Sequence, residues 1–140
     1  MKIYNGAGMI LGRLAAHAAK DALLGEEVQV VNCEKIIISG RKTNTFAHEK
    51  EKWDRRGYPS RSPKYSRLPD KFVRLAIRGM LPWQFARGKA AYRHIYCHVG
   101  MPSGVNEKDL IVLKNSSAKK LPTLKYITVG EICRHLGGKI

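Results

Sequence analysis

The first forty residues alternate between short extended runs and one stretch with helical spacing. Residues 10–24 carry apolar side chains at intervals of three and four, which predicts a helix, and Gly25 follows where helices commonly end in glycine. Extended runs of the kind found in short strands lie at residues 2–5, 28–31 and 36–38. Because strand and helix alternate, the pattern predicts an α/β fold with a mainly parallel sheet covered by helices.

Three helices are predicted in the middle of the chain. A charged run from Thr43 to Trp53 can form the first. Pro69 suits the first position of a second helix that ends at Gly79. The basic residues of this helix recur at spacings of three and four and therefore share one face; they are Lys71, Arg74 and Arg78. The third helix covers residues 84–93.

The last third of the chain gives two clear signals. Residues 94–99 alternate in the manner of a strand, with Ile95 and Cys97 on one side. Thr128 and Glu131 fit a capping box that opens a short final helix. We expect a Pro/Gly/Ser/Lys-rich connection between these two elements.

Length and composition indicate a single soluble domain spanning residues 1–140, with 44% hydrophobic residues to form a core. The net charge of +15 favours a polyanionic partner, nucleic acid before a membrane surface. With neither an apolar run of transmembrane length nor a signal-peptide pattern at Met1, we expect a cytoplasmic protein with no membrane partner. The cysteines predict neither disulfides nor a zinc site, and we expect reduced thiols; they are Cys33, Cys97 and Cys133.

The positive charge is concentrated in the middle of the sequence. Residues 1–40 are neutral, whereas residues 41–93 carry 15 Lys/Arg against 4 Asp/Glu, a net charge of +11. Within this segment, residues 55–63 combine arginines with prolines and a glycine, so we expect an extended loop that an external anion orders. The segment 41–93 is therefore the predicted electrostatic face.

Eight of the 11 aromatic residues fall in the same segment. Helical spacing favours a core position for Phe72, Phe85 and Tyr92. Trp53, Tyr58 and Tyr65 have polar sequence surroundings and are the better candidates for stacking on unpaired bases.

A glycine-rich turn offers an alternative function. Gly6, Gly8 and Gly12 follow a strand and open a helix, and Glu34 ends the next strand, which nearly matches a dinucleotide-binding fingerprint. The spacing of the last two glycines is one residue too long, and a tight strand-to-helix turn favours glycine whatever it binds. A nucleotide-binding Rossmann-like enzyme is thus the second hypothesis.

Other constellations are weaker. On a strand, Cys97 faces away from His94 and His98, so these three residues cannot converge on a metal. His17 and His135 lack a partner at catalytic spacing. Without a legible helix-turn-helix or zinc finger, a DNA-binding regulator is disfavoured against an RNA-binding protein. We expect no enzymatic activity, no cofactor and no small-molecule substrate.

Several strings resemble the universal large-subunit ribosomal protein family L-thirteen, in its archaeal and eukaryotic form. The resemblance runs from about Lys2 to Pro102. Its strings are Gly12-Arg13-Leu14-Ala15, Val30-Val31-Asn32-Cys33-Glu34-Lys35-Ile36, Ser39-Gly40, Ala76-Ile77-Arg78-Gly79-Met80-Leu81-Pro82 and Arg87-Gly88. Pro59-Ser60-Arg61-Ser62-Pro63 is similar to the archaeal and eukaryotic branch, whereas relatives usually carry other residues near Ser62 and Trp83.

The resemblance implies a three-layer α/β/α sandwich with a four-stranded, mainly parallel sheet, a Rossmann-like core without its nucleotide. It also implies a structural role in the large ribosomal subunit, bound to large-subunit rRNA beside neighbouring ribosomal proteins. With the charge pattern, it leads us to expect rRNA contacts from Arg41, Lys42, Arg55, Arg56, Arg61, Lys64, Arg67, Lys71, Arg74, Arg78, Gly79, Arg87, Lys89 and Arg93. Gly79 either lets an RNA backbone approach closely or merely caps its helix.

Overall fold

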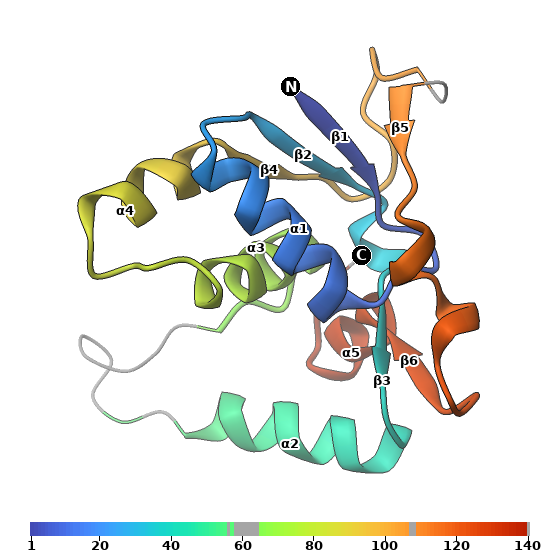
Figure 1. Cartoon of the computed structure of the whole chain (residues 1–140). Helices are drawn as coiled ribbons and strands as arrows, with labels where there is room; N and C mark the ends of the chain where they lie inside the picture. The colour runs from blue at the N-terminus through green and yellow to red at the C-terminus, as the bar shows by residue number, and fades with distance from the viewer. Residues whose placement is uncertain (56, 58–64, 107–108, 140) are drawn as a thin grey trace.

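The larger of two sheets has four parallel strands and lies in the upper part of Figure 1. The computed structural model describes residues 1–55, 57, 65–106 and 109–139. The strands stand in the order β4–β2–β1–β5, and each neighbouring pair is parallel. They are β1 (Lys2–Asn5), β2 (Val28–Val31), β4 (Ile95–Cys97) and β5 (Leu110–Ile111).

Three helices pack together beside this sheet: α1 (Leu11–Leu23), α3 (Pro69–Gly79) and α4 (Ala86–Arg93). The helical spacing of α1 buries Leu14 and a row of alanines among the core side chains of β1, β2 and β4. At its end, Gly25 adopts a φ of +92° and donates its amide to the Ala22 carbonyl at 3.1 Å. This glycine cap matches the predicted end of the helix.

The remaining elements gather around a second, smaller sheet. Here β3 (Ile37–Ser39) pairs antiparallel with β6 (Tyr126–Thr128). The next helix, α5 (Val129–His135), begins with the predicted capping box, in which Thr128 Oγ1 accepts the Glu131 amide at 3.2 Å. Helix α2 (Lys42–Asp54) buries none of its residues and contacts α5; Figure 1 shows it along one side of the molecule, away from the parallel sheet. Short 3-10 turns are η1 (Cys33–Lys35), η3 (Lys114–Ser116) and η4 (Ala118–Lys120).

The predicted fold class is confirmed: the chain has an α/β fold with a parallel four-stranded sheet, consistent with a three-layer α/β/α sandwich. The predicted helices are present, and α4 begins two residues later than expected, after Phe85 at its N-cap. The sequence did not predict β5 or β6, and the run at 36–38 enters the small antiparallel sheet instead of the parallel one. With two and three residues, β5 and β6 are too short to show an alternation of polarity by themselves, whereas β4 lies within the longer alternating run 94–99.

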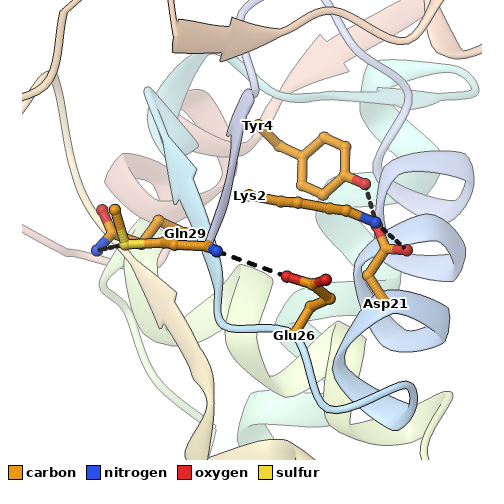
Figure 2. A network of polar contacts seen from close by, with 6 residues as sticks. Lys2, Tyr4, Asp21, Glu26 and Gln29 are labelled. Atoms are coloured by element: carbon orange, nitrogen blue, oxygen red, sulfur yellow. Dashed lines mark hydrogen bonds and ion pairs between the residues drawn. The ribbon is translucent and has the colours of Figure 1, made fainter.

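A polar network ties the first strand to the first helix. Figure 2 shows Lys2 and Tyr4 of β1 both pointing at Asp21 of α1. The Lys2 ammonium lies 2.9 Å from the carboxylate, and the buried Tyr4 hydroxyl donates a short hydrogen bond to it. Burial opposes ionisation of Asp21, but the hydrogen bond from Tyr4 and the charge of Lys2 outweigh it and lower the pKa of this carboxyl. Burial and the same carboxylate raise the pKa of Tyr4.

Candidate nucleic-acid interface

The glycine-rich turn between β1 and α1 is shaped by internal packing. A Cβ on Gly6 would lie 2.6 Å from Ile36 Cγ1 and 2.9 Å from the Val31 carbonyl oxygen, so only glycine fits there. The backbone of residues 116–118 lies against the turn, because Ser116 accepts the Ile10 amide at 2.7 Å and Ala118 donates to Gly8 at 2.9 Å. Gly6 and Gly8 thus serve the fold, and the nucleotide-binding hypothesis loses much of its support.

Glu34, the acidic member of the fingerprint, is also engaged within the chain. Its carboxylate accepts the backbone amide of Gly100 at 3.0 Å, which ties η1 to the segment after β4. A carboxylate used in this way is not presented to a ribose. The acid of the fingerprint is therefore a structural group.

The basic face of α3 packs on aromatic rings of the segment that follows it. The Arg74 guanidinium lies 4.5 Å from the centroid of the Tyr92 ring, and that of Arg78 lies 4.0 Å from the centroid of the Trp83 ring. The two rings meet edge to face, with centroids 5.2 Å apart. We call these four residues the arginine–aromatic stack. It joins α3 to α4 and fixes the direction of both guanidinium groups.

The two arginines of the stack have different surroundings. Arg74 Nη2 donates weakly to the Tyr92 carbonyl at 3.5 Å, and its buried Nε has no hydrogen-bond partner among the described residues. The Arg78 side chain makes no hydrogen bond or ion pair within the described part of the chain, and stacking occupies only the face of its planar guanidinium. Its N–H groups lie in that plane and stay available to an anion. Of the pair, Arg78 therefore has the side chain that better fits the predicted phosphate contact.

A close backbone approach fixes where α4 begins. A Cβ on Gly88 would lie 2.2 Å from the Pro82 carbonyl oxygen, so α4 can meet the preceding segment only through glycine. This contact leaves Phe85 at the N-cap with 63% of its surface exposed, so the expected core position of Phe85 is wrong. Phe72 and Tyr92 pack against the core, as predicted. The expected RNA ligands on α4 are all exposed: Arg87, Lys89 and Arg93.

Helix α2 carries a second group of cations. The Arg67 guanidinium lies 4.3 Å from the centroid of the half-buried Trp53 ring, so this ring has a partner within the chain. Arg55 forms a short hydrogen bond with Glu51 on the exposed side of α2, which lowers the pKa of that carboxyl. Lys42 pairs with Glu131 of α5 at 3.2 Å. The pKa of Glu131 is lowered chiefly by the backbone amide of Thr128.

Gly79 does not end α3 in the manner of a glycine cap. The cap residue is Met80, with a φ of −96°, and Gly79 is absent from the positive-φ glycines. A Cβ built on Gly79 would meet nothing within 4 Å. The helix-capping hypothesis for Gly79 is therefore wrong, whereas close approach of an external group stays a prediction.

The structure places the predicted ligands on several elements of one molecule. Exposed cations lie on α2, on α4 and in the segment before α3; they are Arg41, Lys42, Arg55, Arg67, Arg87, Lys89 and Arg93, together with Lys71 on α3. Tyr65 is half-buried. The predictions for Arg56, Tyr58, Arg61 and Lys64 concern positions outside the described residues.

The remaining candidate chemistry is structural. Cys33 and Cys133 are both fully buried; burial, followed by Asp70 and Glu49, raises the pKa of Cys133 to about 12. Among the described residues, no group of His, Cys, Asp and Glu is arranged to hold a metal ion. No helix in the described ranges combines the length and the apolar character that a bilayer crossing needs.

The fold and this surface define a class: a basic α/β protein whose parallel sheet carries cationic helices. Comparison with known proteins then identifies the family. Residues 1–104 match the family model described as Ribosomal protein L13, and the chain belongs to that family, as the resemblance in the sequence predicted.

Curated relatives extend this similarity over nearly the whole chain. The large ribosomal subunit protein uL13 of Methanococcus maripaludis is 42% identical over 142 residues, covering 99% of both chains. That of Methanococcoides burtonii is 37% identical with the same coverage. That of Archaeoglobus fulgidus is 38% identical and covers 96% of this chain and 86% of its own length. The chain is therefore similar to archaeal members of the family.

Proposed function

We propose that the chain is a non-catalytic, structural constituent of the large ribosomal subunit that binds large-subunit rRNA directly. The RNA contacts lie on the segment 41–93, and the protein sits in the cytoplasmic subunit beside neighbouring ribosomal proteins, where it supports assembly and translation. The names of the archaeal relatives, large ribosomal subunit proteins, support the location.

The observation that carries the proposal is the uneven distribution of charge over the elements of the folded chain. The neutral segment 1–40 supplies β1, α1 and β2, whereas residues 41–93, at net +11, supply α2, α3 and α4. Exposed lysines and arginines neutralise phosphates, and their planar or flexible donors suit folded RNA. A sheet domain with little net charge serves as the rigid mount of this surface.

Equilibrium binding of the full chain to in vitro transcribed large-subunit rRNA of Methanococcus maripaludis tests the proposal. If roughly six to ten phosphates are contacted, affinity falls by about three to five orders of magnitude between 50 and 200 mM salt on the duplex scale, and somewhat less on folded RNA. Duplex DNA is expected to compete poorly. A flat salt response, or equal competition by duplex DNA, contradicts direct and RNA-specific binding.

A further inference from the structure

A hollow lies where the start of α2 meets β6. One of its walls belongs to the predicted basic face, and the other lies outside it. Its volume is about 410 Å³, and its walls are residues 40–43 and 124–126. The Gly40 amide donates to the Lys125 carbonyl at 2.9 Å, and Ser39 stands opposite Tyr126 in the small sheet. The backbone therefore fixes the two walls relative to each other, although they are distant in sequence. We call this feature the α2–β6 hollow.

The hollow is cationic. Arg41 and Lys42 stand on one wall and Lys125 on the other, and all three are exposed. Lys42 is paired with Glu131, a carboxylate that reaches it from α5. Arg41 and Lys125 make no side-chain hydrogen bond or ion pair within the part of the chain that the structure describes. Two unpaired cations thus flank one surface depression, which favours an anionic ligand.

Apolar side chains line the same hollow. Tyr126 is 39% exposed and Leu124 is 93% exposed, although both are large and apolar. Tyr126 is also one of the three aromatic residues outside the segment 41–93. An exposed ring that lines the same hollow as two cations offers a stacking surface for a base whose phosphates the cations neutralise.

We infer that the α2–β6 hollow binds an unpaired nucleotide of the RNA, with Arg41 and Lys125 on its phosphates and its base on Tyr126. The inference rests on the proposed function and extends the RNA surface to C-terminal residues that the charge distribution did not indicate. Lys42 is a weaker ligand there, because Glu131 shares its charge.

The cations are tested through the salt dependence of rRNA binding. In the double variant Arg41→Gln/Lys125→Gln, the slope of log affinity against log salt becomes less steep by about 0.7 for each lost phosphate contact on a single strand. The control is Lys20→Gln/Lys35→Gln, which removes the same charge from exposed positions on α1 and η1. This control is expected to keep the wild-type slope.

The ring is tested through affinity at fixed salt and through covalent crosslinking. Tyr126→Ala weakens rRNA binding roughly five-fold or more at every salt concentration, because stacking on one base is lost, whereas Tyr126→Phe keeps the ring and the affinity. Ultraviolet irradiation of the wild-type complex, followed by mass spectrometry, places a nucleotide adduct on the peptide that contains Tyr126. If Tyr126→Ala does not fold, the crosslinked adduct and the Arg41/Lys125 variant still show whether the α2–β6 hollow binds RNA.

The outcomes separate the two proposals. Wild-type protein that ignores rRNA at low salt overturns the proposed function itself. Wild-type protein that binds with a steep salt slope, while the Arg41/Lys125 variant matches its control and no adduct forms on Tyr126, overturns only the α2–β6 hollow. If Tyr126→Ala binds rRNA as tightly as wild type while the Arg41/Lys125 variant has a less steep salt slope, the hollow binds phosphates only. That result overturns the stacking of a base on Tyr126.

Discussion

Gly79 and Gly88, both in the basic segment 41–93, have opposite surroundings. At Gly88, the Pro82 carbonyl oxygen occupies the space that a Cβ would need. Gly79, by contrast, lies in a right-handed helix with open space where its Cβ would be. Among the residues that the structure describes, nothing prevents a side chain at Gly79, although glycine in a helix costs about 0.5–1 kcal/mol relative to alanine. A destabilising residue without an internal reason is typical of a surface that a partner approaches.

The exchange of each glycine for alanine separates these reasons. Gly88→Ala forces the α3–α4 connection apart and lowers the free energy of unfolding by about 1–3 kcal/mol, the usual range for overpacking. Gly79→Ala leaves the fold unchanged or stabilises it by up to about 1 kcal/mol, yet weakens rRNA binding because a Cβ keeps the RNA backbone at a distance. Urea unfolding and rRNA titration measure the two effects. Unchanged RNA affinity in Gly79→Ala would exclude Gly79 from the interface.

Asp21 gives the stability of the chain a dependence on acid pH. Its pKa is lowered in the folded state, so its contribution is fully present above the ordinary carboxyl pKa of about 3.9 and is lost as the pH falls through the lowered value. In Asp21→Ala the buried Tyr4 hydroxyl loses its acceptor, which costs about 1–3 kcal/mol at neutral pH. The double variant Tyr4→Phe/Asp21→Ala recovers part of this loss.

The measurement is urea unfolding between pH 3 and pH 7. The difference in unfolding free energy between wild type and Asp21→Ala is expected to shrink toward the acid end, because the Asp21 carboxyl of the unfolded chain takes up a proton at a higher pH than that of the folded chain. Glu27→Ala, at an exposed position near the same helix end, serves as the control. A difference that stays constant across this range would show that the Asp21 charge does not stabilise the fold.

At the scale of elements, the sequence predicts the helices well and the shortest strands poorly. The helical spacing of α1, Pro69 at the start of α3 and the Thr128 capping box are local signals, and each element lies where its signal predicts. The strands β5 and β6 depend on partners far away in the sequence, Ile3 and Ile38 among others. Two or three residues carry no period, so only the tertiary structure determines these strands.

The same limit applies to the candidate interface. The cations of the segment 41–93 are visible as a local excess of charge, and their helices follow from spacing. Lys125 lies outside the segment 41–93, at the end of the Lys-rich connection, and joins Arg41 only through the pairing of β3 with β6. The internal stacking of Arg78 on Trp83 was equally invisible, because a ring and a guanidinium four residues or more apart have many possible partners.

Helix α2 depends on α5 for its position. It buries no residue, and its contacts with α5 include the Phe46–His135 stack, with centroids 4.2 Å apart, and the Lys42–Glu131 pair. Thr128→Ala removes the cap of α5 at a cost of about 1 kcal/mol. We expect hydrogen exchange in residues 42–54 to accelerate along with that of α5, while β1 and β2 keep their protection.

The control for this experiment is Thr123→Ala, at an exposed position before β6. If hydrogen exchange in α2 is unchanged in Thr128→Ala, contacts other than those with α5 hold the helix in place.

At the scale of the whole molecule, the position of a charge matters more than its number. The chain carries 26 lysines and arginines, and 15 of them lie in the segment 41–93. Electrostatic attraction between a protein and RNA depends on how many cations release counter-ions at the contact surface, so equal charge losses at different places have different effects. Solvent-exposed charges contribute little to folding, since a surface ion pair is worth about 0–1 kcal/mol.

Two triple variants with equal net charge test this directly. Arg55→Ala/Arg56→Ala/Arg61→Ala removes three predicted ligands and is expected to reduce the salt slope of rRNA binding by about two to three while Tm stays nearly unchanged. Lys20→Ala/Lys35→Ala/Lys114→Ala removes three exposed lysines outside the segment 41–93 and is expected to leave the slope almost as in wild type. Equal effects of both triple variants would mean that RNA responds to net charge alone. A fall in Tm in the arginine variant would show instead that these arginines stabilise the fold.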